Sequence, residues 1–309
     1  MPYMDADSAI PARPVSVIVP VLKDRRVARL LDSLQTQTFP EDQFEVIVVD
    51  NSGDGEIRRI VARYNYRYLV ERPKGSYAAR NAGLAHASGQ ILAFTDADCI
   101  ADSAWLESLV EAFTDEQIGG VGGTIVKTEG GSWVQRASFE LQPSESALQF
   151  LPFSLLPYAA TANVAYRAGV LRQIAGFDTS FKSGGDVDIS WRVGLSGYWM
   201  APCAEAVIHH EMRPSLAAYF GQYLVYGLEQ VQLFGKHRGA LRQRSFTRGH
   251  SIRDLRRACL HLLRALSRKP AAGRTRFHEV QLATLRLTIS VALLCGRLMG
   301  CIKYRVLYL

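Results

Sequence analysis

Three apolar segments in the first hundred residues each end abruptly at a polar residue or a turn. They are 15–20, 44–50 and 91–95, and a helical repeat of apolar residues over 27–34 lies between the first two. Strands that are apolar throughout, rather than at every second residue, are typical of a parallel sheet covered on both faces. The sequence therefore predicts an α/β fold with a mostly parallel, Rossmann-like sheet sandwiched by helices.

The segment 91–98, Ile-Leu-Ala-Phe-Thr-Asp-Ala-Asp, ends in two carboxylates, Asp96 and Asp98. On an extended backbone the side chains of residues i and i+2 point the same way, so both carboxylates can converge on one cation. Mg²⁺ and Mn²⁺ suit oxygen ligands, and Mg²⁺ is often shared between carboxylates and substrate phosphates. The pair predicts a metal–diphosphate platform, and the alternative is a polar turn that ends a strand.

The predicted strands place further candidate residues at the same edge of the sheet. In open α/β sheets, ligands bind beyond the carboxyl ends of the strands. A short third strand is also predicted over 66–70, which makes 91–95 the fourth. Pro20 ends the first strand, Asp50 ends the second and Asp96 follows the fourth. We therefore expect these residues to share one rim.

Charge is distributed unevenly along the 309 residues, whose formal net charge is +7. Segment 236–276 contains 13 Lys or Arg and one acid, whereas 1–235 contains 19 Lys or Arg and 27 acids. The segment 277–309 is apolar, and its longest charge-free run, 287–296, is about half of the roughly 20 residues that span a bilayer. A basic segment followed by an interrupted apolar one favours an anionic membrane surface as partner of 236–309.

The basic segment has two other interpretations. Nucleic acid is also polyanionic, but no familiar groove-reading module is evident, so no nucleic-acid partner is expected. The second alternative is a helical cap with a solvated basic face. Scattered cysteines and the absence of a signal-peptide pattern in 1–14 predict a cytoplasmic protein, peripheral on the inner face of the membrane.

Several short motifs occur in a fixed order within residues 14–227. They are Val17-Ile-Val-Pro20, Val49-Asp-Asn-Ser52, Arg80-Asn-Ala-Gly83, Thr95-Asp-Ala-Asp98, Ala162-Asn-Val-Ala-Tyr-Arg167, Gly176-Phe-Asp178, Gly184-Gly-Asp-Val-Asp188 and His210-Glu-Met-Arg213. Together the motifs resemble the family 2 glycosyltransferases, which are inverting, nucleotide-sugar-dependent enzymes with the GT-A fold.

The resemblance implies a nucleotide-sugar donor and assigns residues to it. Pro20 and its loop, with Asp50, would hold the base, and Asp50 favours UDP by accepting from a uracil-type N–H. Arg80 would lie near the nucleotide, Asp96 near the ribose, and Asp98 would be the direct metal ligand.

Two further residues are candidates on the donor side. His210 matches the family's histidine three residues before an arginine, and its imidazole would complete a Mn²⁺ or Mg²⁺ shell or contact the diphosphate. Lys74 would approach a phosphate, and the alternative is a solvated loop lysine.

The resemblance also assigns the acceptor side. Family members usually carry Gly-Glu-Asp where this chain has Gly184-Gly185-Asp186, so Asp186 is predicted to be the general base and the Glu is missing. The alternative is helix N-capping by acids. Asp188 would cap or orient the helix that follows.

Three more residues, Asn163, Trp191 and Arg192, are acceptor or supporting candidates, although core packing is the usual fate of a tryptophan.

We predict a catalytic domain over 1–214 and a basic, amphipathic helical region over 215–309. The expected activity is transfer of a sugar, from UDP-sugar by preference, to a hydroxyl of a lipid-linked saccharide or cell-surface polysaccharide precursor. One alternative is a nucleotidyltransferase, which would need a Gly-rich, basic phosphate loop that the segment 21–24 lacks. The other is a non-catalytic binding module, suggested by Gly185.

Overall fold

The computed structural model describes residues 14–53, 55–151, 154, 156–239, 250–267 and 275–308. The expectation about the first 13 residues therefore lies outside the described part of the chain. The strands are β1 (Val15–Val21), β2 (Phe44–Asp50), β3 (Arg67–Val70), β4 (Ile91–Phe94), β5 (Cys99–Ala101), β6 (Ile118–Thr128), β7 (Ser144–Glu145), β8 (Val164–Arg167) and β9 (Trp199–Glu211). The helices are α1 (Val27–Leu34), α2 (Glu56–Val61), α3 (Ser76–His86), α4 (Trp105–Glu111), α5 (Trp133–Leu141), α6 (Ala168–Gln173), α7 (Gly185–Leu195), α8 (Leu216–His237), α9 (His250–Ser267) and α10 (Arg276–Tyr304), with a 3₁₀ turn at Glu41–Gln43.

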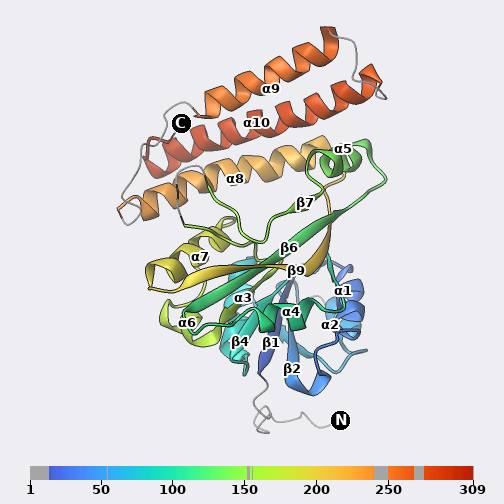
Figure 1. The fold of residues 1–309 in the computed structure, drawn as a ribbon, viewed down its shortest axis with the longest axis vertical. Helices are drawn as coiled ribbons and strands as arrows, with labels where there is room; N and C mark the ends of the chain where they lie inside the picture. Colours follow the sequence, from blue (N-terminus) through green and yellow to red (C-terminus); the bar gives the residue numbers. More distant parts are fainter. Residues whose placement is uncertain are drawn as a thin grey trace.

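The described strands form one mixed sheet in the order β3-β2-β1-β4-β8-β6-β9-β5, with β7 paired to β6 (Figure 1). Strands β1 to β4 are mutually parallel, as the uninterrupted apolar runs predict. Strand β8 runs antiparallel to β4 and β6, and β9 returns parallel to β6. The Rossmann-like α/β fold class is confirmed, with the parallel arrangement in the first half of the sheet and a mixed arrangement in the second.

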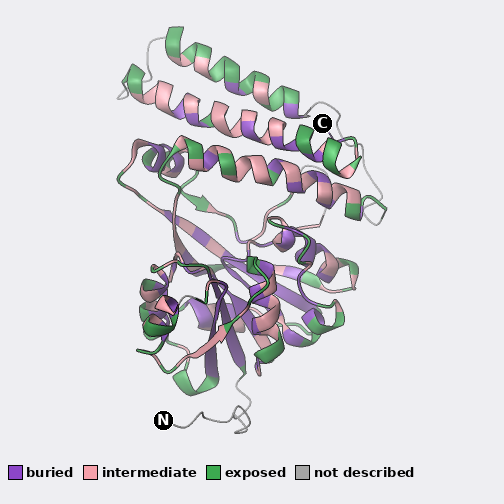
Figure 2. Cartoon of the chain, turned by 180° about the vertical axis from the view of Figure 1, so that it is seen from behind, coloured by how far each residue is buried: buried purple, intermediate pink, exposed green. Residues whose placement is uncertain are grey.

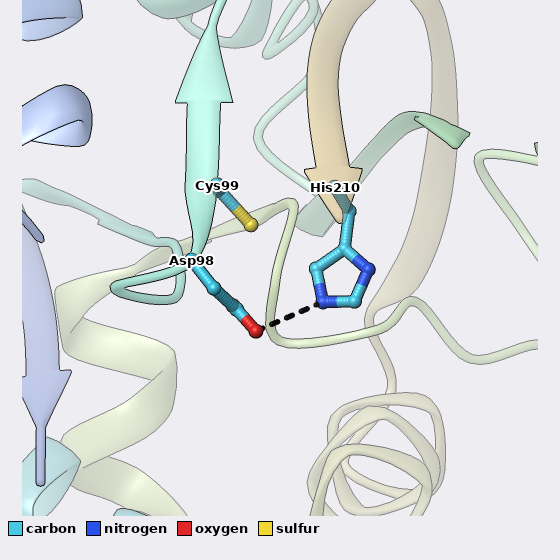
Figure 3. A group of neighbouring side chains, drawn as sticks. All are labelled: Asp98, Cys99 and His210. Carbon is cyan, nitrogen blue, oxygen red and sulfur yellow. Dashed lines mark ion pairs between the residues drawn. The ribbon is translucent and has the colours of Figure 1, made fainter. Parts of the chain in front are cut away.

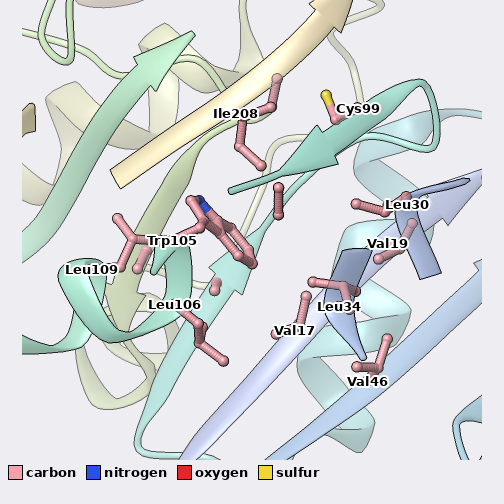
Figure 4. Close-up of a cluster of buried hydrophobic side chains, with 14 of the residues drawn as sticks. Val17, Val19, Leu30, Leu34, Val46, Cys99, Trp105, Leu106, Leu109 and Ile208 are labelled. Atoms are coloured by element: carbon pink, nitrogen blue, oxygen red, sulfur yellow. The ribbon is translucent and has the colours of Figure 1, made fainter. Parts of the chain in front are cut away.

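Both faces of the sheet are buried, which explains the strands' composition. Val15, Val17 and Val19 of β1 pack in a cluster with α1, α2 and α4 (Figure 4). Ile18 points to the other face, where it joins a second cluster with residues of α3, α6 and α7. All seven residues of β1 are buried. A strand buried on both faces loses the alternation of polar and apolar residues.

The C-terminal helices form a separate layer beside the sheet domain, in which α10 packs against both α8 and α9 (Figure 1). Gly227 of α8 and Gly296 of α10 permit a close approach, because a Cβ on either would lie 2.4 Å or less from a backbone oxygen of the other helix. Helix α9 is largely exposed along its outer side (Figure 2). Residues of α5, α8 and α10 share a third apolar cluster.

Helix α10 is long and apolar enough to cross a membrane by length and composition, with 28% of its most apolar window buried. One cation in it is nevertheless buried: the Arg297 guanidinium donates to Gln230 Oε1 of α8 at 2.8 and 3.0 Å. It also donates to Ser251 Oγ of α9 at 2.8 Å. Arg297 therefore ties the three C-terminal helices together.

A buried carboxylate attaches α8 to α7. Asp188 is fully buried, and its oxygens contact Arg192 Nε at 2.8 Å, Lys236 Nζ at 2.7 Å and His237 Nε2 at 2.8 Å. Burial alone would raise the pKa of Asp188, but hydrogen bonding to His237 and the charges of Arg192 and Lys236 lower it to about 2. Asp188 does not cap α7, contrary to one expectation, because the N-cap of that helix is Gly184. Its contacts instead hold the last turn of α8 against α7.

Candidate active site

A cavity of about 800 Å³ opens at the carboxyl edge of the parallel strands, between the sheet and α8. Six of the predicted site residues line it: Pro20, Arg80, Asp96, Asp98, Asp186 and His210. The edge rule for parallel strands thus brings together residues separated by almost 200 positions. The volume of this cavity lies within the range of small-molecule sites, roughly 300–1,000 Å³.

Asp98 and His210 form a pair with the chemistry of a metal site. Strands β5 and β9 pair antiparallel with Cys99 opposite His210, which brings Asp98 Oδ2 within 3.4 Å of His210 Nε2 (Figure 3). These atoms and Cys99 Sγ all lie within 4.8 Å of one another. Burial raises the pKa of the Cys99 thiol well above its usual value, so it stays protonated and is a poor ligand. The Asp98 carboxylate is a ligand type that suits Mn²⁺ or Mg²⁺, and a neutral His210 imidazole could add one nitrogen ligand.

Cations surround this pair. Arg26 Nη2 lies 3.3 Å from Asp98 Oδ2, and Arg213 lines the same cavity. Burial would raise the pKa of Asp98, but His210, Arg26 and Arg213 hold it below its usual value. Asp98 is therefore ionised at neutral pH, as a metal ligand must be.

Asp96 has a different partner from Asp98. Its Oδ1 forms an ion pair with Arg80 Nη2, and the Arg80 guanidinium is 2% exposed and lies over the rings of Tyr77 and Phe177. The expectation that both carboxylates converge on one cation is corrected here. Strand β4 ends at Phe94, so Asp96 and Asp98 stand in a turn where the alternation of an extended strand does not apply.

Asp186 lies in the first turn of α7 and faces the cavity. Burial raises its pKa to about 6, although the Val187 N–H, which donates to Oδ1 at 3.0 Å, and the charge of Arg80 lower it. A carboxylate with a raised pKa is the better proton acceptor, yet at pH 7 most of this group is still ionised. The geometry suits a general base.

Tyr77 occupies the space beside Gly185. The Gly185 N–H donates to the Tyr77 hydroxyl at 2.9 Å, and a Cβ at position 185 would lie 2.6 Å from the ring carbon that bears the hydroxyl. The ring is stacked on Phe177, with centroids 5.6 Å apart, so it cannot swing aside freely. The Tyr77 ring therefore occupies the space that a side chain at position 185 would need.

Asp50 and Lys74, both predicted to bind the donor, do not line the cavity. Asp50 is fully buried; Ser52 N–H and Oγ–H both donate to its Oδ1 at 2.7 Å, and the Tyr68 hydroxyl donates to Oδ2 at 2.7 Å. Asp50 thus caps the end of its strand, and the prediction that it contacts a base is corrected. Its neighbour Asn51 lines the cavity instead. Lys74 is exposed and does not line the cavity.

Three acceptor-side candidates are structural. Asn163 receives a hydrogen bond from Trp105 Nε1 and donates to the backbone oxygens of Thr124 and Ala206, each at 2.8 Å. Trp191 is fully buried, with Nε1 donating to a backbone oxygen at 3.0 Å. Arg192 donates to Asp188 and to two backbone oxygens near α6. These polar groups are satisfied inside the fold, so their assignment to the acceptor is corrected.

Sequence reasoning missed several cavity residues, namely Arg26, Glu145, Lys182, Gln222 and Tyr226. Arg26 has the clearest signal in retrospect, because it follows the first strand in a charged loop. The others stand outside the recognised motifs, and those on α8 reach the cavity only through helix packing.

The chain resembles known proteins over most of its length. The family model described as "Glycosyl transferase family 2" matches residues 16–175. The chain is 32% identical to "Glycosyltransferase AglE" of Haloferax volcanii over 240 residues, which are 74% of this chain and 77% of the relative. It is 30% identical to the "Pre-mycofactocin glycosyltransferase" of Mycobacterium tuberculosis over 73% of this chain but 48% of that protein.

One solved structure resembles nearly the whole fold. It is the "Mannosyltransferase PcManGT from Pyrobaculum calidifontis in complex with GDP-Man and Mn2+", with a TM-score of 0.65 and 21% identity over 95% of this chain and 89% of that one. At this identity the likeness establishes the fold. Asp186 and His210 lie beyond the matched range of the family model, so their roles depend on the geometry described above.

The contact between Gly185 and Tyr77 predicts a stability cost for any side chain at position 185. Gly185→Ala should lower the free energy of unfolding by about 1–3 kcal/mol, because the new Cβ overpacks a ring that has no free space. Urea unfolding measures this, and Gly169→Ala is the matched control because a Cβ there meets nothing within 4 Å. Equal losses, or no loss, in the two variants would contradict the packing described.

Proposed function

The chain belongs to the family 2 glycosyltransferases, and we propose that it is an inverting enzyme that transfers a sugar from a nucleoside-diphosphate sugar to a hydroxyl of a saccharide acceptor. The observation that carries this proposal is the lining of one cavity by two distinct groups. The first is the Asp98–His210 pair with its neighbouring arginines, and the second is the carboxyl group of Asp186. A donor diphosphate needs the first group and an acceptor hydroxyl needs the second.

On the donor side, Asp98 and His210 would hold a divalent ion, Mn²⁺ or Mg²⁺. When bound, the ion neutralises charge that develops on the departing diphosphate. Arg26 and Arg213 lie close enough to Asp98 to oppose the same negative charge. Arg80, held by Asp96 and by its stacking on Tyr77, adds a positive charge that is already desolvated.

On the acceptor side, Asp186 takes the proton of the acceptor hydroxyl. The hydroxyl oxygen then forms a bond to the anomeric carbon of the donor sugar, and the bond from that carbon to the diphosphate oxygen breaks. The nucleoside diphosphate leaves with the electron pair, and a single displacement inverts the anomeric centre.

The nucleobase is the least determined part of the donor. The preference for UDP depends on Asp50, whose oxygens are already bonded to Ser52 and Tyr68. The structural neighbour is a complex with GDP-Man. UDP and GDP are therefore both candidates for the nucleotide of the donor.

We further propose that the C-terminal helices bring the enzyme to an anionic membrane surface, on the inner face of the cell membrane, where a lipid-linked acceptor would lie. Helix α9 supports this, since Ile252 and Leu263 lie on one side of it and are 63% and 59% exposed. Arg256 is exposed on the same side as these two residues, and Arg253, Arg257 and Arg264 are exposed on an adjacent side. Exposed apolar side chains interspersed with arginines suit an anionic lipid interface, where the arginines contact the headgroups.

The base assignment predicts a pH dependence. Because the pKa of Asp186 is raised to about 6, kcat/KM should fall as the pH falls through about 6, whereas an ordinary carboxyl would keep activity to about pH 4. Asp186→Asn should keep donor binding and lose transfer by about 10²–10⁴-fold. Asp102→Asn, at a surface ion pair, is the control. Transfer by Asp186→Asn at the parent rate would rule out this base.

The membrane proposal predicts binding of the full chain to vesicles that contain phosphatidylglycerol, weaker at high salt and weaker still to neutral phosphatidylcholine. Ile252→Asp with Leu263→Asp should weaken binding about tenfold or more, because each buried apolar side chain contributes about 1.5–3 kcal/mol. The control replaces two exposed apolar residues outside these helices, Val70→Asp with Leu195→Asp. Sedimentation with vesicles measures this, and equal binding by both double variants would exclude α9 as the lipid-binding element.

A further inference from the structure

A second cavity adjoins the first on the side of Asp186. Its volume is about 300 Å³, and it lies between α8, the segment around β7 and the start of α7, with Leu293 of α10 at its wall. Asp186 and Tyr226 line both cavities. The proposed base therefore stands where the two spaces meet, and a ligand in the second cavity can present a group to Asp186 without entering the space of the donor diphosphate.

The lining of this second cavity has the chemistry of a sugar-binding site. Tyr158, Tyr223 and Tyr226 contribute aromatic faces and hydroxyl groups. The Tyr223 and Tyr226 rings meet edge to face with centroids 5.3 Å apart, so they form one continuous aromatic wall. Tyrosine combines an apolar face with a polar tip, which suits a ring whose faces are apolar and whose rim carries hydroxyls.

The polar groups of the wall are arranged to accept and to donate. The Tyr226 hydroxyl accepts a hydrogen bond from Gln222 Nε2 at 2.7 Å, which leaves its own proton for an oxygen atom of a ligand. The Tyr158 hydroxyl already donates to Gln149 Oε1 at 2.9 Å, whereas burial raises the pKa of the Tyr223 and Tyr226 hydroxyls, so these two stay protonated at neutral pH. Glu229 of α8 is 2% exposed and supplies carboxyl oxygens, one of which accepts from the Lys182 N–H at 3.3 Å.

We propose that this second cavity binds the terminal sugar residue of the acceptor and directs one of its hydroxyls at Asp186. The proposal rests on the function proposed above and adds where the acceptor lies and which elements select it. A volume near 300 Å³ is at the small end of ligand sites and suits a single ring rather than a length of polymer. It also makes α8 and α10 part of the catalytic apparatus, because Tyr223, Glu229 and Leu293 belong to those helices.

The test uses the full chain and a panel of methyl glycosides of glucose, galactose, mannose and N-acetylglucosamine. Binding is followed by saturation-transfer NMR with a nucleoside diphosphate and Mn²⁺ present. We expect at least one glycoside to bind. Glu229→Gln and Tyr223→Phe, which line the second cavity and not the first, should each weaken it by about 3–10-fold, the effect of one lost hydrogen bond.

A bulky residue gives a second, independent result. Leu293→Trp should fill the cavity and abolish glycoside binding, whereas Leu298→Trp, at a residue of the same helix that is 43% exposed, should not. Each variant must keep the melting shift produced by the nucleoside diphosphate, which reports a folded donor side.

Three results would overturn the proposal: no glycoside of the panel binds the parent, Leu293→Trp binds as the parent does, or the Glu229 and Tyr223 variants weaken a nucleotide sugar rather than a glycoside. The last result would assign this cavity to the donor sugar. Absence of any nucleotide binding by the parent would instead count against the proposed function as a whole, so the two failures are distinguishable.

Discussion

The burial of the sheet on both faces is the constraint on which the rest of this structure depends. Because β1 and its neighbours are covered by helices on each side, no polar side chain can emerge from their faces without a desolvation cost. Polar side chains of these strands lie near the strand ends, where they have partners: Ser16 donates to Glu45 near the amino ends, and Asp50 ends β2. The parallel arrangement of β1 to β4 puts their carboxyl ends at one edge, where the candidate site residues lie.

The C-terminal helices complete the site that the sheet begins. Helix α8 covers the cavity, and its last turn is held to α7 by Asp188, which binds Lys236 and His237. Helix α7 also carries Asp186 in its first turn. The position of Asp186, the proposed base, therefore depends on the packing of α7 against α8, the helix that covers the cavity. Arg297 of α10 extends this connection to α9, because its guanidinium donates to Gln230 of α8 and to Ser251 of α9.

Much of the fold could be predicted from the sequence, because strong apolar runs and motif order determine where strands lie. The same motifs predicted Asp98, Asp186 and His210 as site residues, and the three line one cavity. The errors have specific causes. The spacing of Asp96 and Asp98 predicts a shared side-chain direction only on an extended strand, but β4 ends at Phe94. Asn163 and Trp191 are polar or aromatic residues whose partners come from distant segments, and sequence cannot distinguish such buried groups from ligand-binding ones.

The second cavity lay beyond sequence reasoning for a related reason. Tyr223, Tyr226 and Glu229 are on α8, whose pattern predicts an amphipathic helix but not which residues its inner side contacts. That depends on close packing between α8 and α10, which the small residues Gly227 and Gly296 permit. Arg26 was missed because a single arginine in a loop has no periodic signal.

The most direct measurement is titration calorimetry of UDP, GDP, CDP and dTDP with and without Mn²⁺, on the parent and on Asp98→Ala. His209→Ala is the control, because His209 is the neighbour of His210 but pairs with Asp102 on the surface. The structure predicts that one diphosphate binds the parent only with Mn²⁺, that Asp98→Ala abolishes this binding and that His209→Ala retains it. Metal-independent binding, or binding unchanged in Asp98→Ala, would contradict the assignment of Asp98 and His210 as the metal–diphosphate site.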